Sequence, residues 1–140
     1  MKESIERDIL IIIGSESDRG QIQPGIDKAE ELGLSYTVKV YSAHRQLDEL
    51  LDYLEHNARY FRVIIAAAGL SAALPGIVAS KTTLPVIGVP LLAGSLNGID
   101  ALLSILQMPK GIPLATMGIG KQGIINAVLL AQRIINLTKI

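Results

Sequence analysis

The sequence lacks cysteine and tryptophan altogether, and its only histidines are His44 and His56. Without cysteine the chain can form no disulfide, no thiolate metal site and no thiol nucleophile. Two histidines among scattered carboxylates make a poor ligand set for zinc, so we expect no metal centre. Acid–base chemistry near neutral pH would therefore depend on one of these two imidazoles.

The sequence also has no excess of charge and no long hydrophobic run. Lys and Arg together number 13, as do Asp and Glu, so the formal net charge is zero. A balanced chain with no run of like charges is a poor partner for nucleic acid or an anionic membrane. Residues 1–8 mix charges, and the five apolar residues after them are too few for a signal-peptide core or a membrane span. We expect a cytoplasmic enzyme or binding protein.

Aromatic residues are scarce, at 4% of a chain in which hydrophobic residues make up 49%. The core must then be built from Ile, Leu, Val and Ala, which suits helices packed closely on a parallel sheet. Apolar runs that end in turn residues predict strands over residues 9–13, 36–41, 62–68, 85–89 and 114–118. Helical spacing predicts a first helix that ends at Gly33, followed by helices over 47–54, 77–81, 99–106 and 122–137. Pro24 implies that the first helix starts late or bends.

Five strands that alternate with five helices predict an α/β fold. We expect a single domain over residues 1–140, built as a three-layer, doubly wound parallel sheet. Right-handed crossovers and short loops favour the flavodoxin-like strand order 2-1-3-4-5. Ligands of such sheets bind at the carboxyl ends of the strands, where the order reverses. The loops after the first three strands, residues 14–18, 42–45 and 69–76, should therefore form one site.

Residues 41–45 offer a hydroxyl, an imidazole and a guanidinium within one strand-to-helix loop. His44 can take and give a proton at neutral pH, and Arg45 can clamp a phosphate or carboxylate with two hydrogen bonds. Charged loops are also common on surfaces, so a solvated loop without function is the alternative. The predicted position at the switch point of the sheet favours a functional site.

Three further segments carry weaker signals. Residues 14–18 could bind an anion through backbone N–H groups and hydroxyls, or Ser17 or Asp18 could cap the following helix. The small residues of 69–76 allow a ligand to approach closely, or make a tight turn against a neighbour. Residues 118–123 match the letters of the dinucleotide fingerprint, but no acidic residue follows them, so we interpret them as a structural turn.

Taken together, these segments resemble the PurE family, the catalytic subunit of phosphoribosylaminoimidazole carboxylase in purine biosynthesis. The resemblance spans essentially the whole chain and is carried by residues 14–18, 42–45, 74–76, 81–90, 96–98, 103–105, 107–109 and 111–113. Class I members of this family are mutases that move the carboxylate of N5-carboxyaminoimidazole ribonucleotide (N5-CAIR) from N5 to C4. Class II members carboxylate aminoimidazole ribonucleotide (AIR) with CO2. Residues 81–90 and 107–113 look like class I, so the resemblance implies a class I mutase.

The resemblance also implies roles for individual residues. His44 would be the catalytic residue that shuttles a proton between N5 and C4, and no metal or organic cofactor would be needed. Ser42 and Arg45 would hold the phosphate of the ribonucleotide substrate, and Asp18 would hold its ribose. The implied substrate-binding set is Ser15, Ser17, Asp18, Ser42, Arg45, Gly69 and Leu74. A separate ATP-dependent N5-CAIR synthetase would supply the substrate.

Three positions depart from the pattern of the family. Ala73 stands where class I members usually have a second histidine, Leu70 where they have glycine, and Leu92-Ala93 where they have Gln-Ser. The first two changes make these positions more similar to the class II pattern. The alternatives are therefore a class II AIR carboxylase and a nucleotide-binding relative with impaired catalysis.

Two of the predicted helices are apolar on almost every side, namely residues 99–106 and 124–135. One small domain offers a single core, so further copies of the chain should cover the remaining apolar surface. We expect a homo-oligomer with the last helix packed on a neighbouring subunit. The resemblance implies an octamer whose active sites are completed by neighbouring subunits.

Overall fold

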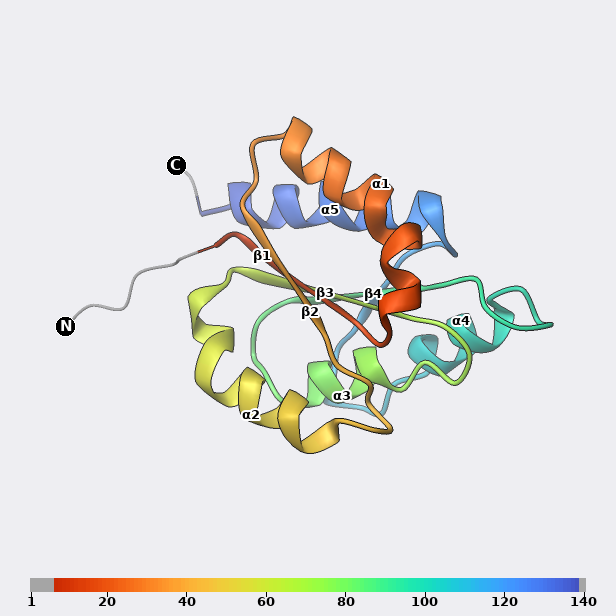
Figure 1. Cartoon of the computed structure of the whole chain (residues 1–140). Coiled ribbons are helices and arrows are strands. Elements are labelled where there is room, and N and C mark those ends of the chain that lie inside the picture. The colour runs from red at the N-terminus through yellow and green to blue at the C-terminus, as the bar shows by residue number, and fades with distance from the viewer. Residues whose placement is uncertain (1–6, 139–140) are drawn as a thin grey trace.

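The computed structural model describes residues 7–138, in which five strands alternate with five α-helices (Figure 1). The strands are β1 (Ile9–Ile13), β2 (Tyr36–Val40), β3 (Val63–Ala68), β4 (Val86–Pro90) and β5 (Ala115–Thr116). The helices are α1 (Arg19–Glu31), α2 (Leu47–Asn57), α3 (Leu74–Ser80), α4 (Ile99–Leu106) and α5 (Lys121–Asn136). Two short 3-10 turns, η1 (Glu16–Asp18) and η2 (Ala58–Tyr60), precede α1 and β3.

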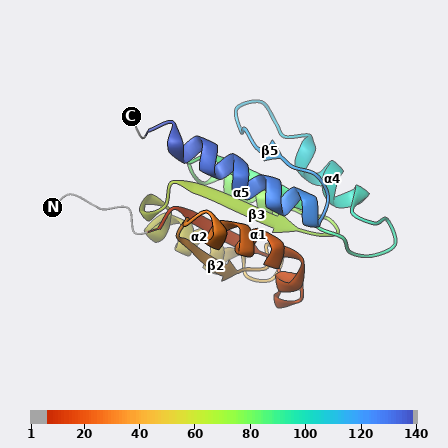
Figure 2. The ribbon, with the colours of Figure 1, turned by 90° about the horizontal axis from the view of Figure 1, so that it is seen from above.

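The strands form one parallel sheet in the order β2-β1-β3-β4-β5, which confirms the predicted fold and strand order. Helices α1 and α5 cover one face of the sheet, and α2, α3 and α4 cover the other (Figure 1). Seen from above, α1 and α5 lie side by side along the sheet (Figure 2). Every βα unit therefore delivers its loop to the same edge of the sheet, where the strands end.

Side-chain alternation along the central strands explains their continuous apolar runs. Ile9, Ile11 and Ile13 of β1 pack under α1 and α5, whereas Leu10 and Ile12 face the helices on the opposite side. A strand covered on both faces needs an apolar residue at every position. The aliphatic core is confirmed, because all five residues of β1 are fully buried and Phe61 is the only aromatic residue among the buried hydrophobic residues described.

Several predicted boundaries were wrong, and proline explains one of them. The helix expected from residue 77 begins at Leu74, because Pro75 lies in its first turn, where a fixed φ and a missing N–H are tolerated. The first helix does not start late: it begins at Arg19 and keeps Pro24 inside, at the cost of one helical hydrogen bond. Edge strand β5 is reduced to two residues, which pair only with Ile87 and Gly88.

The two helices expected to be apolar all round differ from each other. Helix α4 buries Ala101 and Ile105 but exposes Ile99, Leu103 and Leu106 by 51–58%. That prediction was wrong for α5, which exposes polar residues on its outer side and packs its apolar side on the sheet and α1. None of the helices in the described part of the chain combines the length and the apolar character that a bilayer crossing requires.

Candidate functional site

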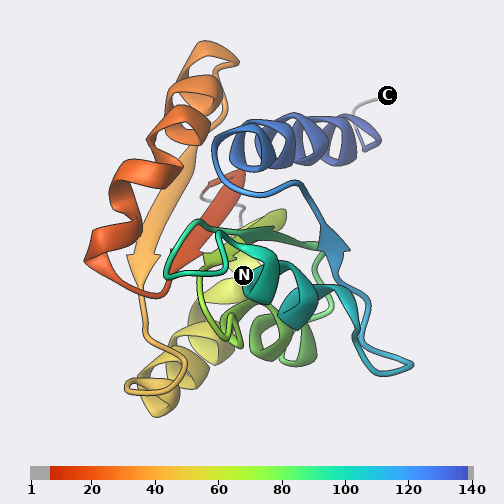
Figure 3. The same ribbon diagram turned by 90° about the vertical axis from the view of Figure 1, so that its right-hand side faces the viewer.

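A cleft of about 870 Å³ opens at the edge of the sheet where the strands end, the side that faces the viewer in Figure 3. The loops after β1, β2 and β3 line it, as the switch-point argument predicted. The loop after β4 also contributes, through Ala93, one of the positions where the sequence departs from the family pattern. All the predicted site residues meet there: Ser15, Ser17, Asp18, Ser42, His44, Arg45, Gly69 and Leu74.

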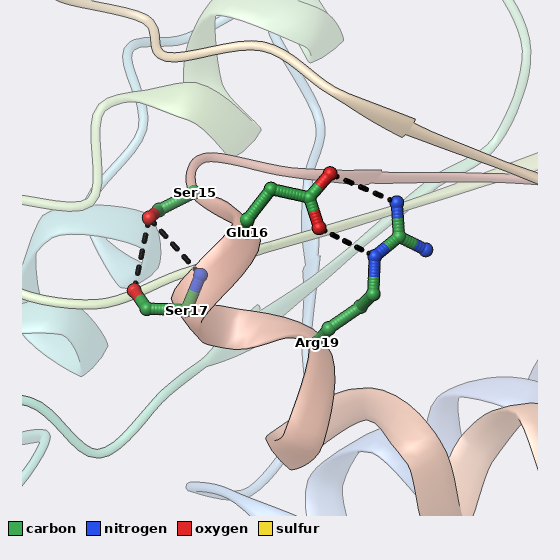
Figure 4. A network of polar contacts seen from close by, with 4 residues as sticks. All are labelled: Ser15, Glu16, Ser17 and Arg19. Atoms are coloured by element: carbon green, nitrogen blue, oxygen red, sulfur yellow. Dashed lines mark hydrogen bonds and ion pairs between the residues drawn. The ribbon is translucent and has the colours of Figure 1, made fainter.

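The loop after β1 is organised by Ser15. Its backbone is extended, and its Oγ accepts a 3.2 Å hydrogen bond from the N–H of Ser17 and lies 2.9 Å from the Ser17 Oγ (Figure 4). The predicted capping by Ser17 or Asp18 was therefore wrong, since Ser15 caps η1 and the Asp18 side chain makes no cap hydrogen bond to α1. Burial raises the pKa of Asp18, partly opposed by the backbone N–H of Ser15.

Glu16 also lines this side of the cleft, but its charge is matched by Arg19. The guanidinium donates from Nε to Oε2 at 2.6 Å and from Nη2 to Oε1 at 3.1 Å (Figure 4). This hydrogen-bonded pair lowers the pKa of Glu16 and raises the pKa of Arg19. Because Glu16 is paired, it opposes an anionic ligand in the cleft less than a lone carboxylate would.

The loop after β2 is closed by hydrogen bonds between Ser42 and residues that follow it. The Ser42 Oγ accepts from the N–H of Arg45 at 3.2 Å, and the Ser42 N–H donates to the Gln46 Oε1 at 3.0 Å. The Ser42 carbonyl accepts from the Gln46 N–H at 2.7 Å. The Ser42 hydroxyl thus shapes the loop and keeps its own O–H to donate. Gln46 was not predicted, because the side chains expected to bond the local backbone are the shorter ones of Ser, Thr, Asn and Asp.

His44 and Arg45 project from this closed turn, and both are exposed. Within residues 7–138 neither the imidazole nor the guanidinium has a hydrogen-bond or ion-pair partner. The loop therefore presents a group that exchanges protons and a fixed positive charge, both uncommitted and both beside the cleft. The solvated-loop alternative does not explain why the loop lines a cleft with Ser15 and Asp18.

The loops after β3 and β4 line the rest of the cleft with mostly apolar residues, although Ser71 adds an exposed hydroxyl. Ala68, Ala72 and Leu74 are 2–8% exposed. A Cβ placed on Gly69 would lie 2.8 Å from the Cβ of Ala93, so only glycine allows the loops after β3 and β4 to approach this closely. Leu70 adopts a φ of 54°, a left-handed conformation that favours glycine.

The glycines of residues 118–123 have a structural role, as interpreted from the sequence. A Cβ on Gly123 would collide with the carbonyl oxygen of Gly118, and Gly120 has a φ of 73°. The turn lies outside the cleft lining and leads into α5. Among the described residues, no group of three or more His, Asp or Glu side chains is placed to hold a metal ion.

The sequence and the fold are both similar to proteins of one family. A family model described as AIR carboxylase matches residues 8–140. The N5-carboxyaminoimidazole ribonucleotide mutase of Bacillus subtilis is 52% identical over 127 residues, 90% of this chain and 78% of that protein. The protein of the same name from Pseudomonas aeruginosa is 50% identical over 126 residues, 89% of this chain and 77% of that protein. A crystal structure of Treponema denticola PurE matches with a TM-score of 0.81 and 31% identity, covering 93% of this chain and 80% of that one.

Proposed function

The chain belongs to the AIR carboxylase family, and from this membership and the cleft we propose that it is an N5-CAIR mutase of purine biosynthesis. It would move the carboxylate of N5-CAIR from N5 to C4 of the same ribonucleotide. The observation that carries this proposal is the free imidazole of His44 in a cleft that also holds an unpaired cation and an apolar wall.

The polar side of the cleft suits the phosphoribosyl end of the substrate. Arg45 supplies an unpaired guanidinium for the phosphate, and the Ser42 hydroxyl can donate a further hydrogen bond. Ser15 and Ser17 add hydroxyls on the neighbouring loop, while Asp18 can accept from ribose hydroxyls. Gly69 and Leu74 lie on the opposite wall, where they would contact the aminoimidazole ring.

The reaction needs one proton to travel between two atoms of the substrate. In the first half, protonated His44 gives its proton to N5 as the N5–carboxylate bond breaks, which leaves AIR and CO2 in the cleft. In the second half, the electron-rich C4 attacks CO2, and neutral His44 takes the proton that C4 then loses. The proton gained at N5 equals the proton returned from C4, so His44 ends as it began and no oxidant or reductant is consumed.

The apolar wall favours the intermediate stage of this scheme. CO2 is uncharged and a weak hydrogen-bond acceptor, so a dry wall of small apolar groups holds it without hydrating it. Ala73, where class I members usually have a second histidine, leaves His44 as the only imidazole among the described cleft residues. That observation keeps a class II AIR carboxylase, which would use CO2 directly, as the second candidate function.

A turnover assay tests the proposal and separates the two candidates. The protein is incubated with N5-CAIR, or with AIR plus bicarbonate, and formation of the C4 carboxylate is followed. We expect rapid product from N5-CAIR and slow product from AIR. The reverse ranking would support the class II carboxylase, and no product from either would leave only a nucleotide-binding relative.

His44→Asn tests the proton transfer itself. We expect the fold and nucleotide affinity to persist while turnover of N5-CAIR falls by about 10²–10⁴, the usual contribution of positioned acid–base catalysis. His56→Asn is the matched control, because His56 is an exposed residue on α2 whose Nδ1 lies 2.9 Å from the Asp52 carbonyl oxygen. A His44→Asn variant that turns over at the parent rate would exclude His44 from the chemistry.

We further propose that the chain works as a cytoplasmic homo-oligomer, an octamer on the pattern of its family, and receives N5-CAIR from an ATP-dependent synthetase. The support within the chain is a surface of exposed leucine and isoleucine side chains on α4 and the loop before it, here called the α4 surface. It comprises Leu92, Leu96, Ile99, Leu103 and Leu106. Exposed apolar groups gathered on one element are typical of an interface. The last helix, on the other face of the sheet, would make a separate and more polar contact with a neighbouring subunit.

A further inference from the structure

We propose that Gln21 is a positioning residue for the mutase reaction, a role that rests on the function proposed above. Its side-chain amide pairs with the backbone of Leu92, 71 positions further along the chain. The Gln21 Nε2 donates to the Leu92 carbonyl at 2.8 Å, and the Leu92 N–H donates to the Gln21 Oε1 at 2.8 Å. The Gln21 side chain thus hydrogen-bonds both the N–H and the carbonyl of Leu92, as the backbone of a neighbouring strand would.

Leu92 depends on Gln21 for this satisfaction. Its N–H and carbonyl take no partner from the backbone of residues 7–138. The loop that it begins runs to α4 through Gly94, with a φ of 71°, and Asn97, with a φ of 51°. Short loops with few backbone hydrogen bonds open easily unless a side chain fixes them. Gln21 is therefore the anchor at the start of the loop after β4.

The residue after this anchor forms part of the cleft wall. Ala93 lines the cleft and touches Gly69 so closely that no Cβ would fit between them. Gly94 packs on Leu70 in the same way, with the Leu70 Cδ2 only 2.9 Å from a Cβ placed there. A shift of Leu92 would be passed directly to Ala93 and would open the contact between the loops after β3 and β4.

Gln21 also lies close in sequence to the polar side of the cleft. Gln21 stands in the first turn of α1, which continues directly from η1, whose N-cap is Ser15 and whose last residue is Asp18. The same helix start therefore positions the nucleotide-binding loop and holds the apolar wall. Gln21 is not among the residues that line the cleft, so we place its effect in fixing the distance between the two sides.

The consequence for the reaction appears at its intermediate stage. Once the N5–carboxylate bond has broken and N5 carries its proton, CO2 must stay until C4 attacks it. If the wall between Gly69 and Ala93 loosens, CO2 escapes and AIR leaves in place of the C4 carboxylate. Loss of the anchor should therefore change the ratio of the two products, a quantity that general destabilisation of the fold does not alter.

The test compares Gln21→Met with Gln23→Met. Methionine keeps the length and packing of Gln21 but removes both hydrogen bonds, and Gln23 is an exposed residue of the same helix whose amide bonds Asp27 at 2.8 Å. AIR and C4 carboxylate formed from N5-CAIR are measured in CO2-free buffer, with a protein-free blank subtracted. We expect the AIR-to-product ratio to rise about 5–30-fold in Gln21→Met, as expected for losing one or two neutral hydrogen bonds, and to stay at the parent value in Gln23→Met.

A second variant and a second measurement keep each outcome decisive. Gln21→Glu retains the acceptor for the Leu92 N–H but loses the donor to the Leu92 carbonyl. If Gln21→Met does not fold, the product ratio of Gln21→Glu is compared with that of the parent instead. Amide hydrogen exchange at Leu92 and Ala93 should quicken in both Gln21 variants only. An unchanged product ratio in an active Gln21→Met protein overturns the inference alone. If the parent protein makes no C4 carboxylate, the proposed function is overturned. If amide exchange at Leu92 and Ala93 is then also unchanged in the Gln21 variants, the anchoring role of Gln21 is overturned as well.

Discussion

Arg45 is the only lysine or arginine among the described residues that line the cleft. Because its guanidinium has no partner in the described chain, removing it should cost binding without leaving an unpaired acid behind. We expect Arg45→Ala to weaken AIR binding by about 1.5–3 kcal/mol, the range for a charge-assisted hydrogen bond. Titration calorimetry measures this, with Arg133→Ala on α5 as the control. Equal affinities for the two variants would remove Arg45 from the phosphate site.

The Asp18 carboxylate should lower the stability of the folded chain while it strengthens the binding of AIR. Burial raises its pKa in the folded chain, so the folded state disfavours the ionised carboxylate. This penalty is absent below the unfolded pKa of about 3.9. It grows as pH rises through the folded pKa and is constant above it. Asp18→Asn should therefore unfold at a higher temperature than the parent at pH 7, and that gain should vanish towards pH 3.

The same substitution would remove the carboxylate that we propose accepts hydrogen bonds from the ribose. We expect the Asp18→Asn protein to bind AIR about 10–150-fold more weakly, the equivalent of one hydrogen bond to a charged group. Thermal melts across pH and calorimetry with AIR provide the two readouts. A variant that is less stable than the parent at pH 7 would show that Asp18 is held by favourable contacts and is not simply desolvated.

At the scale of elements, the turn from β5 to α5 depends on a glycine at position 123. A methyl group there would meet the carbonyl oxygen of Gly118. We expect Gly123→Ala to lower the free energy of unfolding by about 1–3 kcal/mol through overpacking. Gly118→Ala is the matched control, because nothing lies within 4 Å of a Cβ at that position. Chemical denaturation should separate the two variants, and equal midpoints would show that the turn simply relaxes.

Helices and strands could be predicted where residues close together in the sequence determine them. The β-branched run of residues 9–13 and the spacing of 99–106 predicted β1 and α4 at their observed bounds. The ends of α3 and β5 were missed, because the first depends on how Pro75 is used and the second on an edge with a single partner.

The site was predictable to the extent that topology determines it. The strand order brought Asp18, His44 and Gly69 to one cleft, although they lie far apart in the sequence. Gln21 was missed, since a side-chain amide bonded to a backbone 71 positions away leaves no local pattern. The positive φ of Leu70 was equally hidden, because a leucine gives no sign of the left-handed region.

For the whole molecule, the α4 surface is the feature that predicts assembly. Ile99, Leu103 and Leu106 form one stripe of α4, each more than half exposed. We expect light scattering to report a multiple of the 15.0 kDa chain. Leu103→Glu should shift the mass towards the single chain, because an unpaired charge cannot be buried in an apolar contact.

Leu47→Glu is the control for this experiment, since Leu47 is a 40% exposed leucine outside the α4 surface. Its mass should match that of the parent. A parent protein that runs as a single species near 15.0 kDa at micromolar concentration would contradict the proposed assembly and a shared active site with it.

The scarcity of aromatic residues gives the protein an optical property of its own. Tyr41, the residue before Ser42, lies 5.6 Å from Tyr53 between ring centroids, and the Lys39 Nζ stands 5.2 Å from the Tyr53 ring centroid. The chain holds no tryptophan and only four tyrosines, so its ultraviolet fluorescence comes from tyrosine. This tyrosine fluorescence is not quenched by energy transfer to tryptophan. Any ligand that moves the loop carrying His44 disturbs this ring pair. The unlabelled protein thus contains its own fluorescent reporter of cleft occupancy.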